Sequence, residues 1–415
     1  MSRYADLSRA ELAVVVPELL LMGQLIDRSG MAWCISAFGR EEMLQIAIEE
    51  WAAASPIYTR RMQAALGYAP TAPGRGDVVT IFKGLQLDIG APPQFMDFRY
   101  TVHDPWHGEF RLDHCGALMD VEPMGEEYVR GMCHDIEDPT FDATAIASNP
   151  HAQVRPIHRP PRTPADRHPH CAWTVVIDDA HPEPAPVPAL EVTERSRAAT
   201  LALAPIDAAD EGLSDYAGPL LSDLDFAAFS QAALVRIADE VCLQMHLLDR
   251  AFTLAVAERT ETDDELVRIR RKQLVGVAGI GAERLARALG LDRLDPVAGA
   301  LRLLAAHPLL NPAEYVDAEL SGDELVVRPG PADEDGAWIS LCGPDWTAAL
   351  QAVVRGLDAH LDVEVTPLGS EAGWRARVVR RDEAAAEASE VAVVRFSTGA
   401  AFEFQPRRSL PISPV

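Results

Sequence analysis

Residues that can bind metals or transfer protons are concentrated in one stretch of the chain. Nine of the twelve histidines and three of the six cysteines lie between residues 103 and 181. Thiolate and imidazole together favour zinc or iron, whereas magnesium and calcium prefer oxygen ligands. We therefore expect the chemistry of the protein in this stretch, with zinc or iron as the candidate cofactor.

Residue spacing indicates which of these side chains can meet. In a strand over residues 110–115, His114 lies on the apolar face, and Cys115 joins that face only if a β-bulge turns the strand. Cys171 lies on the apolar face of a later strand, and Cys133 and Glu137 share one face of the helix between these strands. These groups can converge under the helix. The predicted metal ligands are His114, Cys115, Cys133 and Cys171.

Side chains near this cluster in the sequence could carry out acid–base chemistry and bind an anion. A metal-bound water or the Cys133 thiolate would attack the substrate, with His134 and Glu137 as general base and orienting group. Arg155 would bind a substrate carboxylate, assisted by His158 and Arg159. The alternative is structural: buried cysteines are common small hydrophobic residues, and arginines in a proline-rich loop often pair with nearby acids.

Other candidate groups have simpler explanations. His103 and His107 flank a predicted turn, so we interpret them as solvated loop histidines. Cys34 and Cys242 lie in apolar helical sequence and are expected in the core. The chain contains no Gly-rich nucleotide-binding motif and no nucleophile elbow, so neither nucleotide binding nor α/β-hydrolase chemistry is supported.

The chain contains an internal repeat. Four short matches occur in constant order at offsets of 222 to 227 residues, and a looser one joins Trp173 to Trp374. The four are 25–28 with 247–250, 61–67 with 284–290, 115–116 with 342–343, and 129–131 with 354–356. This pattern predicts two units of about 200 residues that descend from one ancestor.

Each unit has the same predicted order of elements. In the first, a helix over 40–67 precedes strands over 98–103 and 110–115, a helix over 125–138 that ends at Pro139, and strands over 153–158 and 172–177. The second repeats this order with strands over 314–320, 325–328, 363–366 and 374–379 and a helix over 346–360. We predict an α+β fold of two tandem, internally duplicated units, each with helices packed on a mainly antiparallel sheet.

The repeat also divides the chain by function. We expect an active unit over residues 1–180, a proline-rich and acidic linker over 181–220, and a degenerate repeat over 221–415. The second unit keeps Cys342 opposite Cys115, but it has Asp358 near the position of Cys133 and Gly373 at that of Cys171. The loss of these groups favours function in the first unit alone, with Cys133 and Cys171 essential and Cys342 dispensable.

Charge limits the classes of partner. The chain has 37 Lys and Arg against 63 Asp and Glu, for a net charge of −26. Such a surface repels phosphate backbones and anionic lipids, so we expect neither nucleic acid nor a membrane as partner. Without a visible secretory signal or an apolar run long enough to span a bilayer, we expect a cytoplasmic protein. A homo-oligomer is left open.

The spacing of Cys115, Cys133, Arg155 and Cys171 resembles that of the L-2-amino-thiazoline-4-carboxylate hydrolase-like family, over about residues 30–178. The layout is also similar to 4-vinyl reductase domains, which are small-ligand sensor modules whose cysteines can hold zinc. The resemblance implies hydrolysis of a C–N or C–S bond in a small carboxylate-bearing molecule. The alternatives are a non-catalytic ligand-binding or sensor protein with a structural zinc, and an iron-dependent oxidoreductase.

Overall fold

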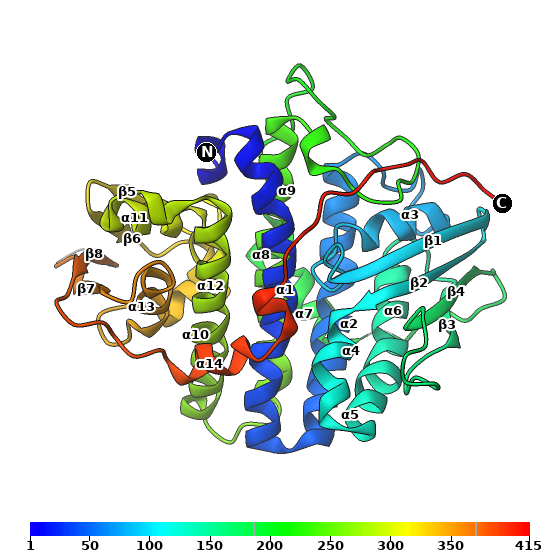
Figure 1. Cartoon of the computed structure of the whole chain (residues 1–415), viewed down its shortest axis with the longest axis horizontal. Coiled ribbons are helices and arrows are strands. Elements are labelled where there is room, and N and C mark those ends of the chain that lie inside the picture. The colour runs from blue at the N-terminus through cyan, green and yellow to red at the C-terminus, as the bar shows by residue number, and fades with distance from the viewer. Residues whose placement is uncertain (186, 370–371) are drawn as a thin grey trace.

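Four long helices stand side by side at the centre of the molecule (Figure 1). The computed structural model describes residues 1–185, 187–369 and 372–415. The four helices are α1 (Arg9–Phe38), α2 (Arg40–Ala65), α9 (Gln231–Ala257) and α10 (Asp263–Ala288). α1 packs against α10, α2 packs against α9, and α1 also contacts α9. Exchanging α1 with α9 and α2 with α10 converts the first contact into the second. The helices are therefore arranged as a two-fold pair of units requires.

The central helices begin at residues that suit their ends. Ser8 caps α1 in a capping box with Glu11, and Ser230 and Thr262 cap α9 and α10. Each side-chain oxygen accepts a hydrogen bond from an amide that has no partner within the helix. Gly39 has a φ of 86° between α1 and α2, a backbone conformation that glycine adopts without steric cost. These caps set the ends of the helices that carry the core.

A four-stranded antiparallel sheet follows the helix pair in each unit. The first contains β1 (Met96–Asp104), β2 (His107–Cys115), β3 (Ala152–His158) and β4 (Cys171–Ile177), in the order β1-β2-β4-β3. The second contains β5 (Ala318–Ser321), β6 (Glu324–Val327), β7 (Leu361–Pro367) and β8 (Trp374–Arg380), in the order β5-β6-β8-β7. The predicted α+β fold in two duplicated units is confirmed by this shared strand order.

Helices cover one face of each sheet. α3 (Val78–Leu85) and α6 (Glu137–Ile146) pack on the first sheet, and α11 (Pro296–Ala306) and α13 (Ala348–Arg355) pack on the second. Alternate residues of β4 are buried, as expected for a strand with one covered face. The strands of the first hairpin have nine residues each and those of the second have four, so the first unit has the larger sheet.

The segment between β2 and β3 differs from its prediction. α4 (Gly116–Val121) and α5 (Glu126–Arg130) lead into a π-helical turn at Gly131–Ile136, and α6 continues to Ile146. The predicted end at Pro139 is therefore wrong. In the π turn the Glu137 amide donates to the Met132 carbonyl, five residues back. Pro139, which has no amide hydrogen to donate, lies directly after this π turn, and the helix continues through it.

The segment over 181–220 contains two short helices and is attached to the bundle. α7 (Pro188–Glu194) contacts α2 and α9, and α8 (Arg197–Thr200) contacts α9. Nζ of Lys83 donates to the carbonyl of Tyr216 at 2.8 Å and to that of Gly218 at 2.6 Å. Residue 186 of the predicted linker lies outside the described residues. The largest hydrophobic core contains residues of both units, so the units share a continuous interior.

After α14 (Ser389–Arg395), the chain crosses from the second unit to the first (Figure 1). We refer to residues 402–415 as the C-terminal strap. Arg407 forms an ion pair with Asp97 at 2.6 Å, and the Val415 amide donates to the Val102 carbonyl at 3.0 Å. The strap therefore lies along β1, an edge strand of the first sheet.

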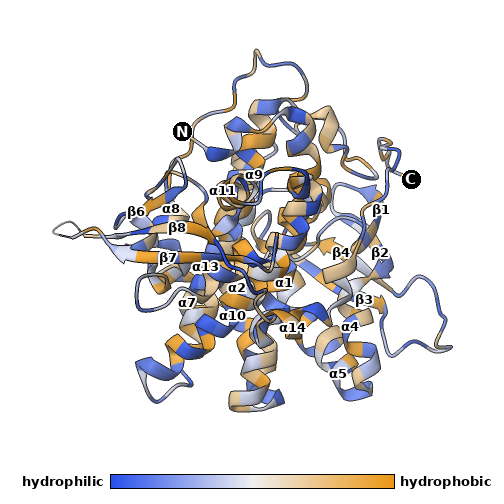
Figure 2. Ribbon diagram, turned by 60° about the vertical axis from the view of Figure 1, so that its left-hand side comes forward, coloured by the Kyte–Doolittle hydropathy of each residue, from blue (hydrophilic) through white to orange (hydrophobic). Residues whose placement is uncertain are grey.

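Hydrophobic residues colour much of the central helices, and hydrophilic residues most of the connecting loops (Figure 2). Within the described ranges, no helix combines the length and the apolar character that crossing a membrane requires.

Candidate functional site

The three cysteines of the active unit lie together in the core. Cys115, Cys133 and Cys171 are each at most 2% exposed, and the neighbouring Cys115, Cys171 and Glu137 each help to raise the pKa of Cys133. The register between β1 and β2 shifts so that Met96 pairs with Cys115 while Phe98 pairs with Leu112. This bulge adds one residue to β2 and turns Cys115 onto the buried face. From the sequence, such a bulge was required for Cys115 to share the apolar face of the strand.

These thiols are poorly suited to act as free thiolates. Burial, together with Glu137, raises the pKa of Cys115 to about 12 and those of Cys133 and Cys171 well above the ordinary value. Without a bound metal the thiols are therefore protonated at neutral pH, whereas nucleophilic attack needs the thiolate. Among the described residues, no three of the predicted ligands bring their ligand atoms within 4.8 Å of one another.

His114 does not join the cysteines. Its ring stacks on Phe402 of the C-terminal strap, with ring centres 6.2 Å apart, and lies 5.8 Å from the ring of His170. His170 accepts a hydrogen bond at Nδ1 from the Cys115 amide, and burial lowers the pKa of His170 to about 4. The same bulge that turns Cys115 inward thus separates it from His114.

The predicted base and carboxylate-binding groups already have partners. Nε2 of His134 lies 2.7 Å from the Pro160 carbonyl oxygen. Nη1 of Arg155 lies 2.9 Å from both carboxylate oxygens of Asp142, and Nη1 of Arg159 lies 2.5 Å from Asp138. His158 lies at the end of β3, where burial and Arg167 lower its pKa. Of the predicted catalytic and substrate-binding groups, Glu137 alone reaches the cavity described next.

A cavity of about 80 Å³ lies between α1, α2 and the elements of the first sheet. Its walls carry charged and polar groups together with apolar and aromatic side chains. They include Gln24, Asp27 and Arg28 from α1, Trp51 from α2, Asp88 after α3, Met96 from β1, and Glu137, Thr140 and Phe141 from α6. A pocket with apolar walls and a few convergent polar groups is typical of small-molecule sites.

Two carboxyl groups in this cavity have raised pKa values. Burial, with a smaller contribution from Asp138, raises the pKa of Glu137 to about 8, and one oxygen of Glu137 is buried without a hydrogen-bond partner. Burial raises the pKa of Asp88 to about 6, although hydrogen bonds from Gly90 and Tyr58 oppose this shift. Carboxyl groups with such values can exchange protons near neutral pH.

Arg28 supplies the positive charge of the cavity. Its guanidinium lies 3.6 Å from Asp27 and 3.9 Å from Asp120, and its Nε is buried without a hydrogen-bond partner. In the sequence, residues 25–28 stood out only as a marker of the repeat, so this role of Arg28 was missed. A usable signal was present, because Asp27 and Arg28 follow the largely apolar run over residues 19–26 of α1, and charged groups beside such a run are costly unless partners are near.

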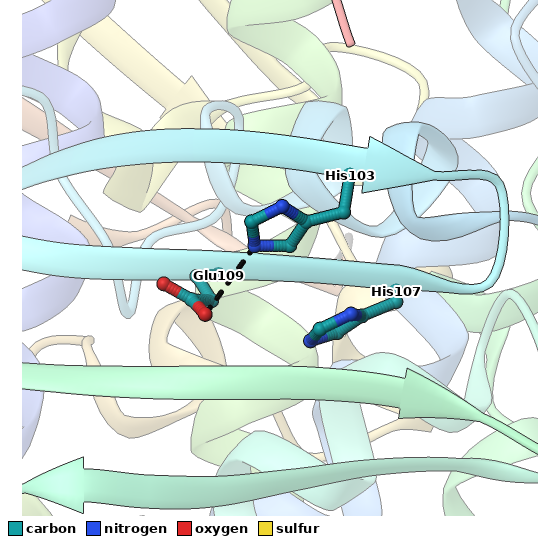
Figure 3. A group of neighbouring side chains, drawn as sticks. All are labelled: His103, His107 and Glu109. Carbon is teal, nitrogen blue, oxygen red and sulfur yellow. Dashed lines mark ion pairs between the residues drawn. The ribbon is translucent and has the colours of Figure 1, made fainter. Parts of the chain in front are cut away.

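A second group of side chains lies on the outer face of the first sheet, at the β1–β2 hairpin (Figure 3). The ligand atoms of His103, His107 and Glu109 all lie within 4.8 Å of one another. Both histidines were predicted to be solvated loop residues, but β1 extends to Asp104 and β2 begins at His107. The i, i+2 spacing of His107 and Glu109 could have placed them on one face of a strand.

Comparison of the chain with protein-family models, with curated proteins and with solved structures gives no match. The resemblance to L-2-amino-thiazoline-4-carboxylate hydrolase-like proteins and to 4-vinyl reductase domains therefore stays a prediction from residue spacing.

Proposed function

We propose that the protein is an enzyme that binds a small carboxylate-bearing molecule in the cavity of the first unit and hydrolyses a C–N or C–S bond. The observation that carries this proposal is the presence in one cavity of Arg28 and of Glu137, whose pKa is raised to about 8. Arg28 takes the role that the sequence analysis gave to Arg155.

Arg28 suits a substrate carboxylate for two reasons. Its Nε has no hydrogen-bond partner, and its nearest protein carboxylates lie beyond ordinary hydrogen-bond distance, at 3.6 and 3.9 Å. A guanidinium can donate two parallel hydrogen bonds to one carboxylate, which fixes the orientation of the ligand as well as binding it. The ligand would then lie with its reacting bond toward α6.

Glu137 suits the role of general acid. At neutral pH its carboxyl group holds a proton, which it can give to the leaving nitrogen or sulfur as water attacks the adjacent carbon. The Glu137 carboxylate then takes a proton from the attacking water, so the group returns to its starting state. Asp88, with a pKa raised to about 6, is largely ionised at neutral pH and can orient the attacking water.

The size of the cavity favours a small substrate. One water molecule occupies roughly 10–15 Å³ of such space, so a cavity of about 80 Å³ holds a compound of few heavy atoms. Trp51 and Phe141 provide flat apolar walls for a ring or a short aliphatic chain. A polymer would not fit.

The test is a panel of small carboxylates that contain C–N or C–S bonds, screened by thermal shift and by release of amine or thiol. We expect one class of compound to stabilise and be cleaved by the wild type. Arg28→Gln should lose binding, and Glu137→Gln should keep binding but lose turnover by about 100-fold or more. Arg250→Gln changes the arginine at the equivalent position of α9 and is the matched control.

Two results would contradict this function. If the panel stabilises wild type and Arg28→Gln equally, the cavity does not bind the carboxylate. Binding that depends on Arg28 without any turnover would instead favour the non-catalytic ligand-binding class.

A further inference from the structure

The β1–β2 hairpin carries three potential metal ligands on the face of the first sheet opposite to α3 and α6 (Figure 3). We propose that His103, His107 and Glu109 form a binding site for a divalent transition-metal ion of the zinc type. The site is separate from the cavity and does not depend on the proposed function.

The distances suit a single ion. Nε2 of His103 lies 3.3 Å from Oε1 of Glu109, and the ring centres of His103 and His107 lie 4.6 Å apart. A tetrahedral site with bonds of about 2.1 Å holds its ligand atoms about 3.4 Å apart. The His103–Glu109 distance already has this value, and all three ligand atoms lie within 4.8 Å of one another. A side-chain rotation of His107 would be enough to complete the set.

The groups are available for an ion. Nε2 of His103 is buried and has no hydrogen-bond partner, although it points toward Glu109. Across the residues that the structure describes, the only ion pair of Glu109 is the one with His103. No arginine or lysine therefore competes with a metal ion for this carboxylate. A cation bound here would satisfy both groups at once.

The backbone holds these ligands in a fixed arrangement. β2 pairs with β1 on one side and with β4 on the other. The turn between β1 and β2 is anchored at both of its residues, because the Val78 amide donates to the Pro105 carbonyl and the Ile177 amide donates to the Trp106 carbonyl. Ligands on paired strands lose little freedom on binding, which favours affinity.

The ligand types select the metal. Two imidazoles and one carboxylate suit zinc and iron(II), whereas calcium and magnesium prefer sites built from oxygen ligands. Three protein ligands leave at least one position for water, which is the arrangement of an open site rather than a closed structural one. The net charge of −26 attracts cations of every kind, so the test must separate a specific site from diffuse attraction.

The test is calorimetric titration of the chelator-treated full chain with zinc chloride in excess magnesium. We expect one zinc ion per chain and a rise in the thermal midpoint on zinc addition. His107→Gln and Glu109→Gln should each weaken binding by more than about 100-fold and abolish that rise. His360→Gln, which changes a histidine of the second unit, should bind zinc as the wild type does.

A cobalt titration separates this site from the cysteine cluster. Cobalt bound by imidazole and carboxylate gives visible bands without thiolate-to-metal charge transfer, whereas cobalt bound by Cys115, Cys133 or Cys171 gives a charge-transfer band. Such a band, or zinc affinity unchanged in His107→Gln, would overturn the proposal. Zinc binding that magnesium abolishes would reduce the site to diffuse charge attraction. All variants should match the metal-free wild type in circular dichroism, because the side chains are partly exposed.

Discussion

The helices α1 and α9 carry the same Asp-Arg pair, but the two units use it differently. In the second unit Asp249 forms an ion pair at 2.9 Å with Arg270 of α10, and both side chains are buried. The offset of 223 that aligns 61–67 with 284–290 places Ala47 of α2 at the position of Arg270. No arginine of α2 therefore occupies that position in the first unit. One substitution between the helices therefore removes the close cationic partner of the aspartate, and Asp27 keeps only the longer contact with Arg28 at 3.6 Å.

The space around this pair also differs between the units. Gln24 lines the cavity of the first unit, and the equivalent residue of α9 is His246. The ring of His246 lies 4.9 Å from that of Tyr315 and 5.3 Å from that of Trp338. Aromatic side chains thus pack where the first unit keeps a polar wall. The comparison teaches that one fold can be filled by aromatic side chains in one copy and enclose a cavity with polar walls in the other.

Removing Arg270 should give the largest effect and would test the structural role of the second pair. Arg270→Met leaves Asp249 buried without a cation, and we expect a loss of about 3–5 kcal/mol in the free energy of unfolding, measured in urea. The double variant with Asp249→Leu should recover most of this loss. Arg28→Met should cost only about 1 kcal/mol, because Arg28 lies farther from its carboxylates. Equal losses for Arg28→Met and Arg270→Met would remove the contrast between the units.

The pH dependence of the free energy of unfolding tests the contribution of Glu137, which lies in the cavity of the first unit. The folded state raises the pKa of this carboxyl from 4.5 to about 8, so it holds a proton that the unfolded chain releases. The stabilisation is complete below about pH 4.5 and is lost as the pH rises through about 8. The contribution of Glu137 should fall by about 3 kcal/mol between about pH 5 and pH 7.5.

The Glu137→Gln variant isolates this contribution, since the amide keeps the shape and cannot ionise. Its unfolding free energy, followed by urea titration across the same pH range, should vary less than that of the wild type. The exposed Glu127→Gln on α5 is the control and should reproduce the wild-type slope. A wild-type slope in Glu137→Gln would mean that this carboxyl is not the group that titrates.

Replacing single cysteines should have the smallest effect. Cys133→Ser, Cys171→Ser and Cys342→Ser each nearly conserve volume in a buried site, and we expect each to lose on the order of 1 kcal/mol, with unchanged metal content. Thermal midpoint and elemental analysis measure both quantities. Loss of metal or activity confined to Cys133→Ser and Cys171→Ser, with Cys342→Ser silent, would restore the cysteine site expected from the sequence.

The sequence predicted the fold better than the site, for physical reasons. The strands could be predicted because the alternation of polar and apolar residues is a local pattern. The two units could be predicted because the same short segments recur in the same order along the chain. The bulge at Cys115 could be named as a requirement but not predicted, because it depends on the pairing of Cys115 with Met96 of another strand. The continuation of the helix past Pro139 depends on a π turn, which has no clear sequence signature.

The site depends on contacts between distant residues. Asp142, which binds Arg155, lies on α6. The sequence predicted that this helix would end at Pro139, before Asp142 is reached. Arg28 reaches the cavity only because α1 packs beside the first sheet. His103 and His107 were interpreted as solvated because they flank the predicted turn, and the predicted second strand began at residue 110 rather than at His107.

The C-terminal strap has a consequence for the order of events during synthesis. β1 and β2 lie near residue 100, but the segment that covers the edge of β1 follows about 300 residues later. Until that segment leaves the ribosome, the Val102 carbonyl at the edge of β1 lacks its partner, and an exposed strand edge is a known route to aggregation. Truncation before residue 402 should therefore lower the yield of monomeric protein more than the loss of the strap contacts alone would suggest.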